Sequence, residues 1–218
     1  MNSADRVAQR WLQATPPRDI DRGKTYYHGT HTEAAGRSIL QSGVIKAPDV
    51  TSKNFLTPVK GRVYVTPTLP YAIIYAIGSN TMGEYFHYFE ERNKADPYGY
   101  LFTIAGRDLA DIQPDEDSVG EMLSMRRPEW LWYFAMTKLS LHMMNKVAEG
   151  DYMWQAKAGK MLMPHLSDAQ KDELIDAGAH IANQGDIPFQ QCWQVTKTDS
   201  EKVRSNGTNF FDVAKRIR

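Results

Sequence analysis

The sequence predicts a soluble α+β protein, and three observations support this prediction. Short runs rich in aromatic and β-branched residues, typical of strands, are interspersed with longer stretches that carry helix-capping residues and apolar residues at helical spacing. Hydrophobic residues make up 42% of the 218 residues and charged residues 24%, which is the range of globular proteins. No apolar run approaches the roughly 18 residues that a membrane-spanning helix needs.

The charge balance and the single cysteine narrow the function classes. Lys and Arg total 26 and Asp and Glu total 26, so the chain lacks the overall basic charge of a dedicated nucleic-acid binder, although a local basic patch remains compatible. Cys192 is the one cysteine, which excludes an intrachain disulfide and a cysteine-based zinc cluster. Charged residues interrupt the N-terminal segment, so we expect no secretory signal, no membrane partner and a cytoplasmic location.

The first half of the chain alternates predicted helices and strands. Residues 3–14 predict a short amphipathic helix and 15–17 a linker, so we expect an N-terminal appendage over 1–17 and a domain over 18–218. Further along, the pattern predicts a strand at 25–28, a helix at 32–42 ended by Gly43, a loop at 44–61, a strand at 63–65, and a helix that Thr68 caps and Gly78 ends.

The second half predicts a mainly helical insertion, about 119–178, between strands. A strand at 100–104 precedes an acidic loop at 111–117, and helices are expected at 120–149 and at 167–177, where Ser167-x-x-Gln170 has the pattern of a capping box. Residues 179–195 predict two short strands, and a last helix is expected from Asn209 to the end.

The most informative local motif is Tyr27-His28-Gly29-Thr30, where a predicted strand ends shortly before a helix. Because Gly29 has no side chain, its backbone N–H and C=O can approach a ligand closely. Tyr64 follows in the segment Gly61–Thr66, within the strand predicted at 63–65, and Tyr75 stands eleven residues beyond it on the next predicted helix. This order can bring two phenol rings together as the walls of a slot for a flat ring.

This arrangement resembles the diphtheria-toxin and poly(ADP-ribose) polymerase branch of the ADP-ribosyltransferase superfamily, over less than half of the chain. In that branch a Tyr-His-Gly-Thr-like turn precedes a helix, and a Gly-x-Tyr-x-Thr-like strand precedes a helix with a second tyrosine; Tyr27–Gly43 and Gly61–Ala76 match this order. The resemblance implies a split β-sandwich core with peripheral helices. It also implies a glycosyltransferase that cleaves the nicotinamide–ribose bond of NAD and transfers ADP-ribose to a macromolecular acceptor, protein or nucleic acid.

The resemblance also implies roles for particular residues. Tyr64 and Tyr75 would stack on the nicotinamide, and cation–π and stacking contacts are worth about 0.5–2 kcal/mol each. The backbone of Gly29 would hold the carboxamide, His28 would bind a ribose hydroxyl, and Thr30 would assist. NAD is then the co-substrate, and no metal is required.

One part of the family pattern is missing. The family usually supplies a glutamate from a late strand, which we expect here at 179–183, and no glutamate stands there. Three explanations remain open: the late strand lies elsewhere, another carboxylate such as Glu121 or Glu116 reaches the site, or the domain binds a nucleotide without efficient transfer. Of the carboxylates, Glu121 is the candidate, because it opens the long predicted helix after an acidic loop.

Two other functions remain compatible with the sequence. One is a catalytically degenerate binding module on the same fold. The other is an enzyme like the RNA 2′-phosphotransferases, which also consume NAD and need basic residues to hold a phosphate. The basic residues that could serve it are Arg37, Lys46, Lys53, Lys60 and Arg62. The pair of tyrosines favours the transferase.

Overall fold

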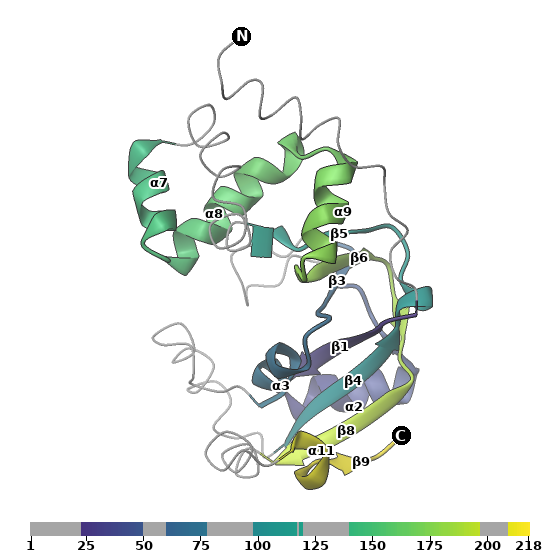
Figure 1. Cartoon of the computed structure of the whole chain (residues 1–218). Helices are drawn as coiled ribbons and strands as arrows, with labels where there is room; N and C mark the ends of the chain where they lie inside the picture. Colours follow the sequence, from purple (N-terminus) through teal and green to yellow (C-terminus); the bar gives the residue numbers. More distant parts are fainter. Residues whose placement is uncertain (1–22, 50–59, 78–97, 117, 120–139, 197–208) are drawn as a thin grey trace. The chain divides into compact units, whose positions relative to one another are not determined.

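The described part of the chain divides into two units in the computed structural model (Figure 1). The structure describes residues 23–49, 60–77, 98–116, 118–119, 140–196 and 209–218. We call the described residues of Asp111–Ala182 the helical unit, and those of Asp21–Pro48, Gly61–Ala110 and Asn183–Arg218 the sheet unit. The elements confirm a mixed α+β protein with antiparallel pairing.

A four-stranded antiparallel sheet forms the sheet unit. Its strands, in spatial order, are β1 (Thr25–Thr30), β4 (Tyr98–Ala105), β8 (Gln191–Thr196) and β9 (Lys215–Arg216). The register of β1 and β4 places His28 opposite Phe102 and Gly29 opposite Leu101. Because successive strand residues point to opposite faces, His28 and Gly29 face different layers of the protein.

Helix α2 (Glu33–Ser42) begins and ends at the residues that the sequence predicts. The Thr32 hydroxyl accepts a hydrogen bond from the backbone N–H of Ala35, which satisfies one of the free donors at the start of the helix. Gly43 has a φ of 75°, a left-handed conformation that glycine adopts without strain. The two caps explain why this short helix has sharp ends.

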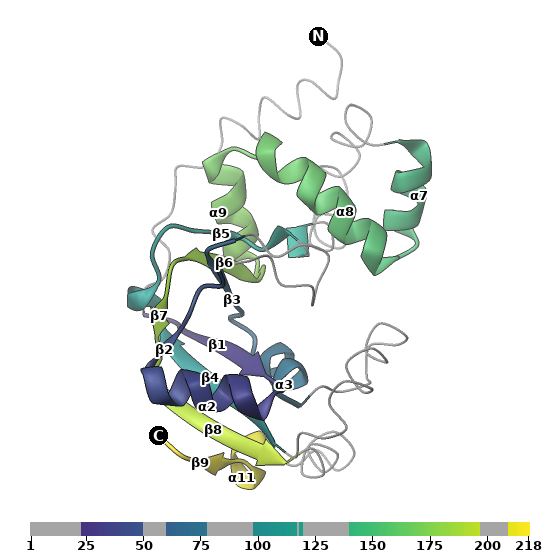
Figure 2. The same ribbon diagram turned by 180° about the vertical axis from the view of Figure 1, so that it is seen from behind.

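Helix α2 packs directly on β4, on the face seen in front in Figure 2. A Cβ atom at Gly36 would lie 2.1 Å from Cδ2 of Tyr100, whose side chain is fully buried. The absence of a side chain at Gly36 therefore sets the distance between helix and sheet.

We expect Gly36→Ala to destabilise the protein by about 1–3 kcal/mol, the usual cost of overpacking a core. Alanine in a helix interior normally gains about 1 kcal/mol over glycine, so a loss would identify the contact with Tyr100 as its cause. Urea unfolding measures the difference, and Ser38→Ala, at an exposed position of the same helix, is the control. A variant as stable as the wild type would contradict this packing.

The opposite face of the sheet is covered by α3 (Leu69–Ile77) and the short α11 (Phe210–Val213) (Figure 1). Their shared core contains the buried residues Ala72, Ala76, Leu101, Val195 and Phe210, with Tyr27, Leu69, Ile73, Trp193 and Ala214 packed against it. Helix α3 therefore lies over the part of β1 that carries Tyr27 and Gly29.

Shorter elements lie elsewhere in the described part of the chain. Strand β2 (Val44–Ile45) pairs with β7 (Ile187–Pro188), and a three-stranded sheet has the order β3 (Arg62–Val65), β6 (Ile181–Gln184), β5 (Ile112–Pro114). A 3-10 turn, η3 (Gly106–Asp108), follows β4.

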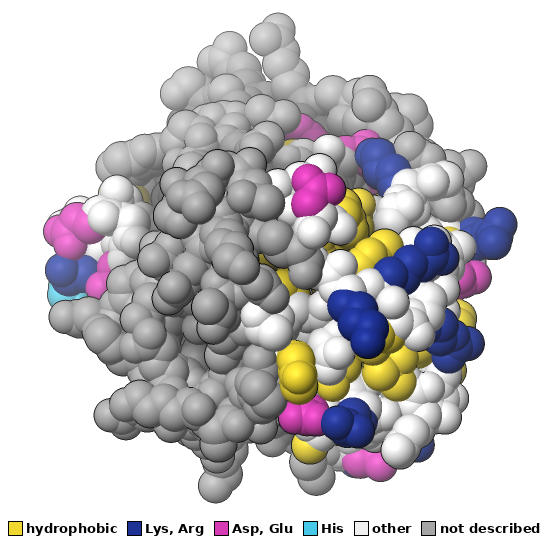
Figure 3. Space-filling model, turned by 90° about the horizontal axis from the view of Figure 1, so that it is seen from below, with side chains coloured by type: hydrophobic (Ala, Val, Ile, Leu, Met, Phe, Trp, Pro, Cys, Tyr) yellow, Lys and Arg dark blue, Asp and Glu magenta, His cyan; other side chains and the backbone are white. Residues whose placement is uncertain are grey.

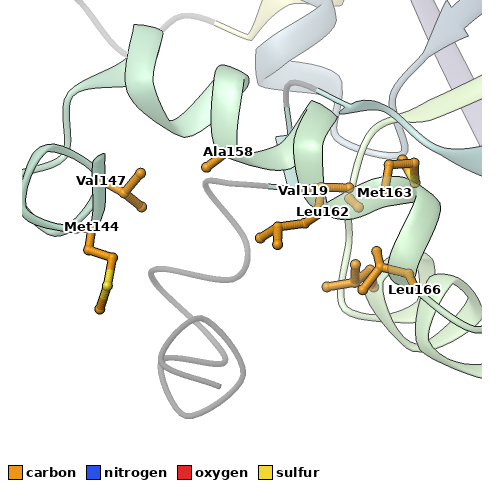
Figure 4. Packing of buried hydrophobic residues seen from close by; sticks show 9 residues of the cluster. Val119, Met144, Val147, Ala158, Leu162, Met163 and Leu166 are labelled. Carbon is orange, nitrogen blue, oxygen red and sulfur yellow. The ribbon is translucent and has the colours of Figure 1, made fainter. Parts of the chain in front are cut away.

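Three helices build the helical unit: α7 (Leu141–Ala148), α8 (Tyr152–Leu162) and α9 (Asp168–Asp176), with the 3-10 turn η4 (Met163–His165) between the last two. The predicted capping box of α9 is confirmed, because both the Ser167 and the Gln170 side chains make their reciprocal bonds. Figure 4 shows the apolar core of this unit, where Val147, Ala158 and Leu162 are fully buried.

Several predicted boundaries are wrong or lie outside the described residues. The helix predicted from Asn209 to the end is shorter than expected and comprises only α11. Ala214 is extended, and Arg216 of β9 pairs with Trp193 of β8. Residues 112–114 form β5 within the predicted acidic loop, the predicted loop at 44–61 begins with β2, and 179–195 holds three strands rather than two. Helix α8 was not predicted. Residues 1–17 and most of the predicted helix 120–149 lie outside the described part.

Candidate functional site

The site begins where β1 and β3 separate. Tyr27 N–H donates to the Thr66 carbonyl at 2.8 Å, and Thr66 N–H donates to the Tyr27 carbonyl at 2.9 Å. This antiparallel bridge is isolated, so the regular ladder between the two strands does not continue beyond it. The edge of β1 that follows Tyr27 is therefore open toward β3.

Gly29 presents its backbone at this open edge. In an antiparallel strand, alternate residues direct both N–H and C=O to the same side. Since Tyr27 bonds to Thr66, away from β4, Gly29 also directs its N–H and C=O away from β4. Among the residues that the structure describes, neither group of Gly29 has a hydrogen-bond partner. A donor and an acceptor thus stand side by side, as recognition of a primary carboxamide requires.

Helix α3 lies against the same glycine. A Cβ atom at Gly29 would lie 2.1 Å from the Ala72 carbonyl oxygen, 2.7 Å from the Ala76 nitrogen and 2.9 Å from Cβ of Tyr75. From the sequence we expect a glycine at position 29 because a ligand approaches the backbone there. The structure gives a further reason, since helix α3 lies too close to leave room for a side chain at Gly29. This contact places Cβ of the half-buried Tyr75 over the face of β1 at Gly29.

His28 connects the edge to Tyr64. Its Nδ1 lies 2.9 Å from the Tyr64 carbonyl oxygen, and its ring centroid lies 6.4 Å from that of Phe102. Burial lowers the pKa of His28, and the hydrogen bond to Tyr64 offsets part of this effect. In the neutral ring Nδ1–H is the donor to the carbonyl, which leaves Nε2 as an acceptor for a hydroxyl group.

Strand β3 orients Tyr64 by simple alternation. Val63 and Val65 are buried, whereas Arg62 and Tyr64 are half-buried and share the other face. In the sheet unit the Tyr64 carbonyl thus lies beside His28, and Cβ of Tyr75 lies beside Gly29. Thr30, the last residue of β1, lies opposite Tyr100.

The structure does not test the predicted role of Glu121 as a catalytic carboxylate, because Glu121 lies outside the described residues. The predicted late strand is present as β6, Ile181–Gln184, and no carboxylate stands in it. His180 immediately precedes this strand.

His180 forms a half-buried pair with Asp115 in the helical unit. Asp115 N–H donates to the His180 carbonyl at 2.7 Å, and His180 Nδ1 lies 4.0 Å from Asp115 Oδ2. Burial lowers the pKa of His180 to about 4. The imidazole is therefore neutral at pH 7.

This pKa predicts acid sensitivity. Because the folded-state pKa lies below that of the unfolded chain, unfolding takes up a proton as the pH falls below about 6.5. We expect protonation of His180 on unfolding to lower the free energy of unfolding by about 2 kcal/mol when the pH falls from 7 to 5. Urea unfolding at the two pH values should show this loss in the wild type and in His165→Gln, an exposed control, and a smaller one in His180→Gln. An equal loss in all three proteins would contradict it.

Other candidate chemistries find no support in the described residues. Among them, no group of three or more His, Cys, Asp or Glu side chains could hold a metal ion. Cys192 is fully buried in β8, as predicted, and burial raises the pKa of its thiol to about 12, which opposes a nucleophilic role. None of the described helices combines the length and apolar character needed to cross a bilayer.

Comparison with known proteins adds no family. No family model, no curated protein and no solved structure matches the chain. Function must therefore be argued from the residues and the geometry of the site.

Proposed function

We propose that this protein is an ADP-ribosyltransferase that uses NAD as its co-substrate. The observation that carries the proposal is the N–H and C=O of Gly29, which have no hydrogen-bond partner among the described residues and lie near the Tyr64 carbonyl and the Tyr75 Cβ. A primary carboxamide offers the complementary acceptor and donor. An aromatic ring that carries such a group could stack on the phenol rings. Nicotinamide has both features.

The reaction would break the bond between nicotinamide and C1′ of the ribose. The electron pair leaves with nicotinamide, which becomes neutral, and an acceptor nucleophile forms a bond to C1′ and loses its proton. Binding the leaving group in a fixed orientation and stabilising the cationic ribose are the contributions that the protein must make. Nε2 of His28 would accept a hydrogen bond from a ribose hydroxyl, and Thr30 would lie beside it. Glu121 stays the candidate for the carboxylate.

The acceptor would be a macromolecule, protein or nucleic acid. On the face drawn in Figure 3, Lys and Arg side chains lie among hydrophobic ones, with Asp and Glu side chains beside them. This mixed face is compatible with either class of acceptor.

One observation favours a second candidate, a binding module that has lost transfer. Strand β6 has no carboxylate where the family pattern expects one. The phosphotransferase alternative gains less, because Arg37, one of its basic residues, pairs with Glu33.

Incubation of the purified chain with NAD, followed by measurement of nicotinamide release and NAD binding, tests the proposal. Release of nicotinamide that increases with an added acceptor would support the transferase. Saturable binding of NAD without release would support the binding module. Absence of both would contradict the proposal.

A further inference from the structure

The bridge between Tyr27 and Thr66 fixes which residues would meet next if β1 and β3 continued to pair. In an antiparallel ladder the residue numbers of opposed pairs have a constant sum, so Gly29 would stand opposite Tyr64. Hydrogen-bonded pairs alternate with non-hydrogen-bonded ones. Since Tyr27 and Thr66 are hydrogen-bonded, Gly29 and Tyr64 would be the next such pair, with the Gly29 N–H bound to the Tyr64 carbonyl.

That carbonyl already has another donor. His28 Nδ1 lies 2.9 Å from the Tyr64 oxygen, so a side chain occupies the acceptor that the Gly29 amide would use. The Gly29 N–H, in turn, has no partner among the described residues. A buried or half-buried carbonyl needs a donor, and here the imidazole supplies it in place of the backbone.

We propose that His28 is a spacer between β1 and β3: its Nδ1–H satisfies the Tyr64 carbonyl and thereby keeps the backbone of Gly29 unpaired for a carboxamide ligand. This inference deepens the proposed function and depends on it for the identity of the ligand. In this role His28 is a positioning residue, and the role is separate from the ribose contact that its Nε2 would make.

Two atoms of one ring therefore have two functions, which substitutions can separate. In His28→Asn the side-chain Nδ2–H occupies nearly the position of Nδ1–H and can donate to the Tyr64 carbonyl, but no group replaces Nε2. In His28→Ala both functions are lost. His28→Phe keeps a ring without a donor, so it distinguishes the hydrogen bond from the bulk of the imidazole.

Hydrogen exchange at the Gly29 amide and binding of free nicotinamide are the measurements. In the wild type and in His28→Asn we expect an unprotected Gly29 amide and equal nicotinamide affinity. In His28→Ala and His28→Phe we expect the amide to pair with the Tyr64 carbonyl, with exchange slowed at least about tenfold and nicotinamide affinity about tenfold lower, the usual effect of one lost hydrogen bond. The asparagine variant should still bind NAD less tightly than the wild type.

An unprotected Gly29 amide in the alanine or phenylalanine variant, measured on folded protein, would overturn the inference. So would loss of nicotinamide binding in His28→Asn. Should the alanine variant fail to fold, the phenylalanine variant decides. If the wild type binds neither nicotinamide nor NAD, the proposed function fails, and the exchange rates of the Gly29 amide still decide whether His28 is a spacer.

Discussion

Replacing both Tyr64 and Tyr75 by alanine is expected to lower nicotinamide release from NAD by about 100-fold, since each stacked or cation–π contact is worth about 0.5–2 kcal/mol. We expect a joint effect because one tyrosine lies beside His28 and the other beside the adjacent Gly29. The Tyr64 carbonyl is bound by the residue before Gly29, and Tyr75 Cβ lies 2.9 Å from where a Gly29 side chain would begin.

Matched variants show whether the aromatic faces are the cause. Tyr64→Phe and Tyr75→Phe keep the rings and should retain most of the release. Tyr98→Ala removes a half-buried tyrosine from the start of β4 and should have little effect on the rate per folded molecule. A folded double alanine variant that releases nicotinamide at the wild-type rate would refute the stacking roles.

The second large effect is expected for Gly29→Ala. The added methyl group would meet the backbone of α3, with 2.1 Å to the Ala72 oxygen and 2.7 Å to the Ala76 nitrogen. Backbone atoms cannot rotate away, so helix or strand must shift, at a cost of about 1–3 kcal/mol or more. Because α3 carries Tyr75, the shift should also weaken nicotinamide binding.

Thermal unfolding and nicotinamide titration measure the two consequences. Thr25→Ala, at the exposed start of the same strand, is the control and should change neither strongly. An alanine variant with wild-type stability would contradict the contact between β1 and α3. A variant that is destabilised yet binds nicotinamide with wild-type affinity would contradict the expectation that the position of α3 affects nicotinamide binding.

Local signals in the sequence predicted the elements that carry their own caps. Thr32 and Gly43 mark the ends of α2, and Ser167 with Gln170 marks the start of α9, because capping bonds join residues that are close in the chain. The resemblance, together with strand and helix patterns, also brought Gly29, Tyr64 and Tyr75 to attention. The structure places the Tyr64 carbonyl beside His28 and Cβ of Tyr75 beside Gly29, while the facing of the two phenol rings and the roles of these residues stay predictions.

Features that depend on distant residues were not predictable from one sequence. The hydrogen bond between His28 and the Tyr64 carbonyl joins residues 36 positions apart and involves no sequence-specific acceptor. The packing of Gly36 on Tyr100 is likewise set by the sheet rather than by helix propensity. The C-terminal residues gave a helical pattern, yet pairing with β8 holds Lys215 and Arg216 as a strand. In each case tertiary contacts override local preference.

The central claim is that nicotinamide binds to the backbone N–H and C=O of Gly29, which pair with no other described residue. The most direct measurement is the nuclear magnetic resonance signal of the Gly29 amide in glycine-labelled protein during titration with NAD. The account predicts a saturable shift of this signal that free nicotinamide reproduces and that the double alanine variant loses. Saturable NAD binding that leaves the Gly29 signal unchanged would contradict it.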